Sequence, residues 1–175
     1  LAAYNADDYA TALQEWTPLA EAGDAPAQFH LGRMLYIRCI RVDCGNFKEA
    51  VKWHRLAAEQ GYAEAQRRLG FMYKTGLGVS QDYKEAVKWF RLAAEQGATI
   101  AQHNLGGMYY NGHGVPQDYK EAMKWYLLAA EQGVSAAHAK IGEMYYNGHG
   151  VLQDYKEAVK WYRLAAELGS AWAQA

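Results

Sequence analysis

In this 175-residue chain, two histidines have a type and a spacing that could support metal binding. His113 and His149 occupy the same position in two copies of Asn-Gly-His-Gly, so neighbouring loops could bring two imidazoles to one metal ion. Zinc sites need more protein ligands than two, and these loops contain no carboxylate or thiolate. We therefore expect both histidines to be incidental surface residues, and we predict neither a metal nor another cofactor.

Cys39 and Cys44 are the only cysteines, and both fall in residues 38–45, which we expect to form an extended loop. They lack the Cys-x-x-Cys spacing of a zinc site. We predict a disulfide that closes this loop, which would indicate an oxidising compartment and a periplasmic or secreted protein. The alternative is a cytoplasmic protein with two reduced thiols.

Serine nucleophiles have no catalytic context in this sequence. Ser80, Ser135 and Ser170 lie at expected turns or repeat boundaries, and none belongs to a Ser-x-x-Lys or Gly-x-Ser-x-Gly motif. Lysines and glutamates alternate on expected helix faces, which is typical of a solvated surface. We therefore predict that the chain is not an enzyme.

Charge and composition exclude further classes of function. The chain has 18 Lys and Arg against 19 Asp and Glu, a formal net charge of −1, which argues against bulk electrostatic binding to nucleic acid. No apolar run approaches the roughly 18 residues of a membrane-spanning helix, so we predict no direct membrane insertion. Apolar residues make up 51% of the sequence, which excludes a disordered chain.

The sequence contains an internal repeat, whose helices must position the histidines, cysteines and serines considered above. Tyr83, Tyr119 and Tyr155 lie 36 residues apart, and a tryptophan follows each of them at the same spacing. A period of this size indicates helical hairpins that stack on one another. The predicted fold class is therefore all-α, an α/α superhelical solenoid of stacked antiparallel helix hairpins with 36-residue repeats.

Each repeat contains signals for two helices. The second helix is expected to begin at an Asp with a Glu three residues later, a capping-box arrangement, and Asn46 with Glu49 repeats this pattern. The predicted capping residues are Asp82, Asp118 and Asp154, and the predicted C-terminal stops are Gly61, Gly97, Gly133 and Gly169.

The first helix of each repeat has a glycine in its interior, which costs about 1 kcal/mol relative to alanine. The same register in four repeats predicts close approach of a neighbouring helix, at Gly32, Gly70, Gly106 and Gly142. Near the N-terminus, Pro18 is expected to kink or end a weaker copy of the second helix.

These motifs, Ala-Gln-x-x-Leu-Gly-x-Met-Tyr, Gly-x-Gly-Val-x-x-Asp-Tyr and Lys-Glu-Ala-x-Lys-Trp-Tyr, resemble the Sel1-like repeat (SLR) family, a relative of the tetratricopeptide repeat. Such repeats typically form a right-handed superhelix that scaffolds protein complexes, so the resemblance implies a protein–protein interaction scaffold or adaptor. Dense, near-identical copies also suggest a bacterial source. The resemblance divides the chain into a degenerate capping helix (1–24), four repeats (25–61, 62–97, 98–133, 134–169) and the start of an incomplete repeat (170–175).

By analogy with tetratricopeptide repeats, the first helices would line a concave face that binds a protein or peptide. Spacings of three and four put the chosen residues of each helix on one stripe. Aromatic rings would supply contact area, and cations would reach carboxylates or a chain terminus. The alternative is a solvated face without a ligand. The predicted binding residues are Phe29, Arg33, Tyr36, Arg67, Phe71, Lys74, His103, Tyr110, Glu143 and Tyr146.

Two other functions stay open. Some cysteine-rich bacterial relatives are linked to penicillin binding and β-lactam hydrolysis, but they have a cysteine pair in each repeat, whereas this chain has one pair. A purely architectural spacer within a larger envelope protein is the other alternative. The open end of the last repeat is expected to expose apolar surface, which predicts end-to-end homo-association or a longer native protein.

Overall fold

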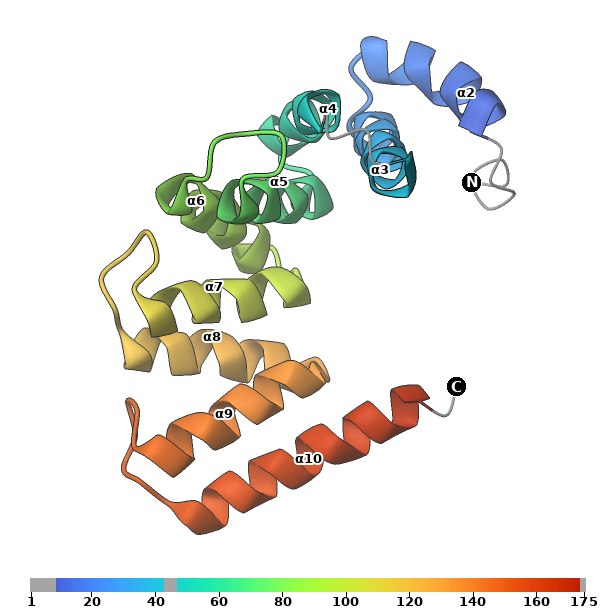
Figure 1. Ribbon diagram of the computed structural model, residues 1–175. Helices are drawn as coiled ribbons and strands as arrows, with labels where there is room; N and C mark the ends of the chain where they lie inside the picture. The colour runs from blue at the N-terminus through green and yellow to red at the C-terminus, as the bar shows by residue number, and fades with distance from the viewer. Residues whose placement is uncertain (1–8, 43–46, 174–175) are drawn as a thin grey trace. The chain divides into compact units, whose positions relative to one another are not determined.

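The computed structural model describes residues 9–42 and 47–173, and all regular secondary structure in these two ranges is α-helical (Figure 1). Within each unit, neighbouring helices pack as antiparallel hairpins, which agrees with the predicted all-α solenoid class. Within the described ranges, none of the helices combines the length and the apolarity that crossing a membrane requires. The helices are α2 (Tyr9–Glu21), α3 (Ala25–Val42), α4 (Lys48–Glu59), α5 (Ala63–Thr75), α6 (Tyr83–Glu95), α7 (Thr99–Asn111), α8 (Tyr119–Glu131), α9 (Ser135–Asn147) and α10 (Tyr155–Ala173).

The chain divides into two compact units, which we call unit 1 (residues 1–93) and unit 2 (residues 94–175). The first helices of the repeats are α3 and α5 in unit 1 and α7 and α9 in unit 2; the second helices are α4, α6, α8 and α10. Each unit has its own buried apolar core. The largest buried side chains are Leu31, Met34, Leu69, Met72 and Phe90 in unit 1, and Leu105, Met108, Tyr126, Ile141 and Met144 in unit 2.

The interior glycines of the first helices allow the close approach that their register predicts. A Cβ atom at Gly70 would lie 2.8 Å from Cδ1 of Phe90, and one at Gly106 would lie 2.9 Å from Cδ1 of Tyr126. Both rings are almost fully buried, so neither can move aside into solvent. The prediction of a close helix–helix contact is confirmed.

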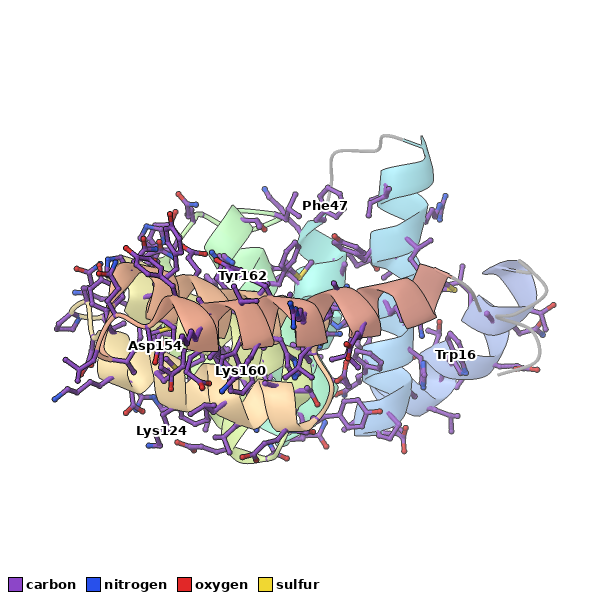
Figure 2. The ribbon with its side chains drawn as sticks, turned by 90° about the horizontal axis from the view of Figure 1, so that it is seen from below. Trp16, Phe47, Lys124, Asp154, Lys160 and Tyr162 are labelled. Carbon is purple, nitrogen blue, oxygen red and sulfur yellow. The ribbon has the colours of Figure 1, made fainter. Side chains whose placement is uncertain are left out.

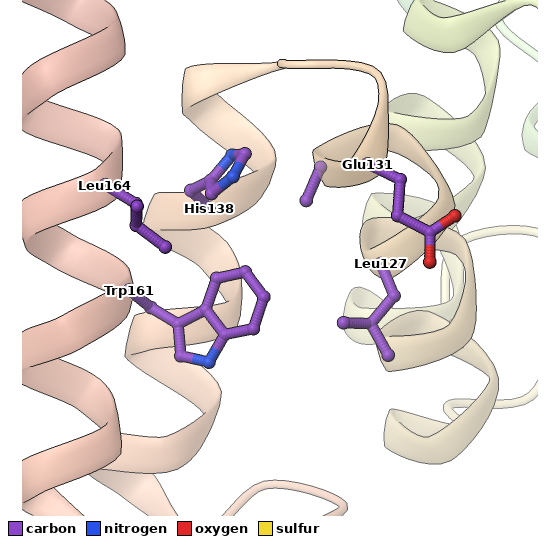
Figure 3. Close-up of a pocket in the computed structure, with 6 residues that line it drawn as sticks. Leu127, Glu131, His138, Trp161 and Leu164 are labelled. Atoms are coloured by element: carbon purple, nitrogen blue, oxygen red, sulfur yellow. The ribbon is translucent and has the colours of Figure 1, made fainter.

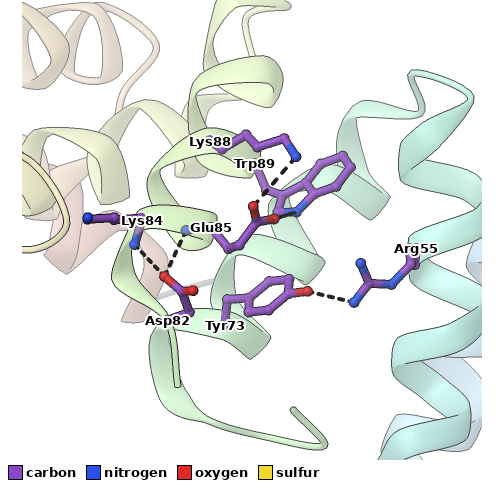
Figure 4. Close-up of polar contacts among 7 residues, drawn as sticks. All are labelled: Arg55, Tyr73, Asp82, Lys84, Glu85, Lys88 and Trp89. Atoms are coloured by element: carbon purple, nitrogen blue, oxygen red, sulfur yellow. Dashed lines mark hydrogen bonds and ion pairs between the residues drawn. The ribbon is translucent and has the colours of Figure 1, made fainter. Parts of the chain in front are cut away.

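The second helices begin with the predicted aspartate caps, but only half of the capping box forms. The backbone N–H groups of Lys84 and Glu85 donate to Asp82 Oδ1 at 2.9 and 3.1 Å (Figure 4). Glu85 does not accept from the Asp82 N–H, which donates to the carbonyl of Tyr73. Instead Glu85 Oε2 accepts a 3.0 Å hydrogen bond from Trp89 Nε1. The glutamate therefore orients the tryptophan. Asp118 and Asp154 cap their helices in the same way, and Asn46 lies outside the described residues.

Three of the four predicted stops of the second helices are confirmed, and the fourth is wrong. Gly61, Gly97 and Gly133 adopt positive φ angles of 88°, 84° and 83°, as a left-handed helix end requires. In contrast, α10 passes through Gly169 and ends at Ala173. Glycine permits the left-handed conformation but does not impose it. Residues 170–173 therefore extend α10.

The first helix of the first repeat, α3, is longer than predicted, because it continues to Val42 through part of the expected loop. The other first helices end at left-handed glycines, Gly76, Gly112 and Gly148. Arg38 stands at the equivalent position, and its Cβ disfavours the left-handed conformation. Cys39 consequently lies in the helix, where it is buried and disulfide-bonded. Its predicted partner, Cys44, lies outside the described residues.

Pro18 does not end α2, which continues one turn further to Glu21. Proline lacks the N–H group that would donate to the carbonyl of residue 14. Its own carbonyl still accepts a 3.0 Å hydrogen bond from the Ala22 N–H. One missing hydrogen bond is therefore not sufficient to stop this helix.

Candidate functional site

The structure leaves all but one of the predicted binding residues at least partly exposed on the first helices. The exception is Phe29, which is a correction: its side chain is 6% exposed. Its ring lies 5.2 Å from the ring of Tyr62 and 5.6 Å from that of His54, within the core of unit 1. Tyr62, at the start of α5, covers it, so Phe29 is not available to a partner.

In unit 2, two predicted residues from neighbouring first helices form one hydrogen-bonded cluster. Tyr110 Oη, on α7, lies 2.9 Å from Glu143 Oε1, on α9, and 3.0 Å from His149 Nδ1. A hydroxyl has one proton, so Tyr110 donates to the carboxylate and accepts from the Nδ1–H tautomer of His149. Lys140 Nζ donates to Glu143 Oε2 at 2.7 Å and lies 5.5 Å from the Tyr110 ring centroid.

These contacts shift the acidity of both partners in unit 2. Burial, followed by the hydrogen bond with Glu143, raises the pKa of the Tyr110 hydroxyl to about 12. Burial alone would raise the pKa of the Glu143 carboxyl, but the hydrogen bonds from Lys140 and Tyr110 outweigh it and the net pKa is lowered. The cluster therefore holds an ionised carboxylate beside a neutral tyrosine at neutral pH.

His149 is not the incidental surface residue that we expected. Its ring stacks on Tyr119 with the centroids 4.4 Å apart and the planes 9° from parallel. The loop that carries it lies against the start of α8, because a Cβ at Gly150 would be 2.8 Å from the Tyr119 carbonyl carbon. The other loop histidine, His113, is exposed as expected. In the described part of the chain, no group of three or more His, Cys, Asp or Glu residues is arranged to hold a metal ion.

In unit 1, the predicted residues form a cationic region with one arginine that was not predicted from the sequence. Arg67 donates two hydrogen bonds to Glu64 Oε2, at 3.0 and 2.7 Å. Arg68, the missed residue, lies 5.7 Å over the ring of Tyr36, which belongs to α3. Burial lowers the pKa of the Lys74 ammonium group, on the same helix.

A pocket of about 240 Å³ opens in unit 2 away from the predicted binding residues (Figure 3). Leu127 and Glu131 of α8 face His138 of α9 and Trp161 of α10 across it. The His138 ring lies 5.6 Å from that of Trp161, and its Nδ1 is 2.9 Å from the Val134 carbonyl oxygen. This pocket was not predicted from the sequence.

The last helix exposes an apolar face that the equivalent helix in the same unit buries. Val159 and Tyr162 of α10 are 48% and 41% exposed, whereas the equivalent Met123 and Tyr126 of α8 are 8% and 1% exposed. On α8 this face packs against α9. On α10 the Tyr162 ring packs against Gly142 of α9 and is still partly exposed, on the side of the helix seen in Figure 2. The apolar exposure predicted for the last repeat is thus present on the second helix of that repeat.

The chain is similar to known proteins over nearly its whole length. The family model "Sel1 repeat" matches residues 25–62, 63–97, 99–134 and 135–170. A protective antigen of uropathogenic Escherichia coli with an SLR fold is 43% identical over 91% of this chain and 34% of its own, with a TM-score of 0.81. A Sel1 repeat protein from Oxalobacter formigenes is 38% identical over 96% of this chain and 68% of its own, with a TM-score of 0.84.

A third similar structure is cysteine rich protein B of Helicobacter pylori, which is 27% identical over 71% of this chain and 92% of its own, with a TM-score of 0.55. No curated protein matches the chain. The chain spans about a third of the length of the E. coli antigen, so that protein's activity as a whole is not transferred to it.

Proposed function

Because the chain belongs to the Sel1 repeat family, whose members generally mediate protein–protein interaction, we propose that it is a non-enzymatic adaptor that binds a protein or peptide through its first helices. The observation that carries this proposal is the surface around Tyr146 in unit 2. Its side chain is 54% exposed on α9, next to the ordered cluster of Tyr110, Lys140 and Glu143.

This surface is held in place before a partner arrives. The Tyr146 ring packs edge-on against that of Tyr155, with the centroids 5.2 Å apart. The hydroxyl of Tyr110 and the carboxylate of Glu143 are fixed by hydrogen bonds within the unit. Rigid side chains lose little conformational entropy on binding, and tyrosines are frequent energetic centres of interfaces. Tyr146 is therefore the side chain whose removal should weaken partner binding most.

We expect Tyr146→Ala to reduce capture of the partner from a cell-envelope extract by tenfold or more, in the range of about 1.4 kcal/mol or above for an interface tyrosine. Captured proteins are identified by mass spectrometry and compared with those retained by wild type. Tyr162→Ala is the comparison variant, since it removes a partly exposed tyrosine from the other helix of the same hairpin. The Tyr162 ring also packs against Gly142, so circular dichroism first verifies that this variant is folded.

A partner lost with Tyr162→Ala and retained with Tyr146→Ala would move the binding site to α10 and contradict the first-helix proposal. The same two variants also report on self-association through the open face of α10, which we propose as the end-to-end contact. Sedimentation velocity of the purified proteins should then show less oligomer for Tyr162→Ala than for Tyr146→Ala.

We also propose a periplasmic or extracellular location. The disulfide bond of Cys39 supports it, because disulfides persist in oxidising compartments and are rare in the cytosol of mesophiles. Recovery of the protein in the cytosolic fraction of its source cell, with both thiols reduced, would contradict this location.

A further inference from the structure

The first helices of both units contain the same pair of a tyrosine and a cation, but only unit 2 supplies a carboxylate that completes it. Lys140 of α9 lies over the Tyr110 ring and donates to Glu143 at 2.7 Å. Arg68 of α5, two repeats earlier, lies over Tyr36 in the equivalent way. At the position that corresponds to Glu143, α5 has Phe71. Among the described residues, Arg68 therefore has no carboxylate at the position from which Glu143 accepts from Lys140.

The surroundings of Arg68 leave this charge poorly compensated. Burial and then the charge of Arg67 lower the pKa of the Arg68 guanidinium, and Arg33 of α3 acts in the same direction. Among the described carboxylates, only Glu64 raises the pKa of Arg68. Glu64 is already ion-paired with Arg67 at 2.7 Å. Arg68 Nε is buried and has no hydrogen-bond acceptor. A buried cationic group with an unpaired donor is costly. Because the Arg68 side chain as a whole is only partly buried, an external anion can approach its guanidinium and offset the uncompensated charge.

We propose that this cationic patch, formed by Arg33, Arg67 and Arg68 around Tyr36, binds an acidic side chain of an extended partner peptide. The carboxylate takes the place that Glu143 has in unit 2. This inference rests on the proposed function, because it names the class of partner that the first helices of unit 1 accept. Guanidinium groups suit this ligand, since their planar donors can bind both oxygens of a carboxylate at once.

The helix also sets a preferred spacing for acidic residues in the peptide. Lys74 lies seven residues after Arg67, on the same stripe of α5 and roughly 10 Å further along the helix axis. A peptide in the polyproline II conformation has three residues per turn and rises about 3.1 Å per residue, so residues three apart lie on the same side and about 9 Å from one another. A peptide with two glutamates separated by two other residues can therefore place one carboxylate at the arginines and the other near Lys74. The chain as a whole has a net charge of −1, so this preference is local and does not extend to polyanions in general.

The test uses a fluorescein-labelled peptide of sequence Gly-Glu-Gly-Gly-Glu-Gly and the whole chain, with binding followed by fluorescence polarisation. We expect wild type to bind this peptide at least about tenfold more tightly than the same peptide with glutamine in place of glutamate. The affinity should fall between about 50 mM and 300 mM salt, because an exposed ion pair is screened.

Three variants assign the binding to the patch. Arg68→Gln should weaken binding of the glutamate peptide by about tenfold or more. Phe71→Glu should weaken it equally, because it supplies the missing carboxylate within the chain, as Glu143 does in unit 2. Lys84→Gln is the matched control, since it removes an exposed cation of unit 1 outside the patch and should change affinity by less than about twofold. Circular dichroism verifies that each variant is folded.

Two results would overturn the proposal. One is equal affinity for the glutamate and glutamine peptides. The other is an oligothymidylate that binds in an Arg68-dependent way while the glutamate peptide does not, which would make the ligand a phosphate polyanion. Neither result affects the Tyr146-dependent capture by unit 2, so a failure here is distinguishable from a failure of the adaptor function itself.

Discussion

Gly106→Val is expected to lower the free energy of unfolding by about 1–3 kcal/mol, the usual cost of overpacking a core. A Cβ at this position would lie 2.9 Å from two atoms of the Tyr126 ring and 3.2 Å from the Ala122 carbonyl oxygen. The ring is 1% exposed and the carbonyl belongs to the backbone of α8, so neither can move without displacing the helix. Thermal and urea unfolding of both proteins measure the loss.

Gly107→Ala is the matched control for Gly106→Val, because the two glycines are adjacent in α7. The nearest atom to a Cβ at Gly107 is Tyr126 Oη at 3.5 Å, which is an ordinary contact. This substitution should stabilise the helix by up to about 1 kcal/mol, since alanine favours helices over glycine. Equal melting temperatures for Gly106→Val and wild type would show that α7 and α8 do not depend on this close contact.

His54→Phe is expected to stabilise unit 1 by about 1–3 kcal/mol at neutral pH, because it removes two buried nitrogens that have no hydrogen-bond partner. His54 is fully buried, and it packs against Gly32 of the preceding helix. The equivalent residue of the next repeat is Phe90, which packs against Gly70 in the same manner. The hairpin architecture thus accommodates a phenylalanine ring at this position.

The advantage of His54→Phe should increase as the pH falls. Burial, followed by the charges of Arg68 and Arg67, lowers the pKa of His54 from 6.5 to about 3. Between these two values the unfolded chain binds a proton that the folded chain does not. The wild type therefore has its full stability above about pH 6.5 and loses it progressively towards pH 3, by about 2 kcal/mol at pH 5.

Urea unfolding at pH 7 and pH 5 separates this effect from general acid sensitivity. When the pH is lowered from 7 to 5, the free energy of unfolding should decrease more for wild type than for His54→Phe. Phe90→His is the reciprocal variant, since it introduces a buried imidazole at the equivalent position and should create a new acid sensitivity. Parallel loss of stability in wild type and His54→Phe would exclude His54 as its source.

Local signals in the sequence predicted most of the helices. The aspartate caps at Asp82, Asp118 and Asp154 form as expected, because a cap depends on backbone groups only two or three residues away. The extension of α3 was predictable in principle, since Arg38 replaces the glycine that ends the other first helices. The continuation of α10 through Gly169 was not, because glycine allows a turn without requiring one.

The candidate sites depended on contacts that no local signal encodes. Helical spacing selected Tyr110 and Glu143, which the structure joins by a hydrogen bond, but it could not show that Phe29 is covered by Tyr62. It also missed His149, whose role arises from stacking on Tyr119 thirty residues earlier in the chain. Arg68 was overlooked because it points towards Tyr36 of another helix, outside the stripe chosen from helical periodicity.

The sequence by itself determined the repeat period, the helical class and the glycine contacts, because each of these follows from residue types at fixed short spacings. Only the tertiary structure decided which side chains meet between helices. Hydrogen bonds between the first helices of neighbouring repeats join residues more than thirty positions apart, as Tyr110 and Glu143 show. Their geometry depends on how whole helices pack, and a change such as Glu143 to Phe71 between repeats alters the chemistry of a face without altering the fold.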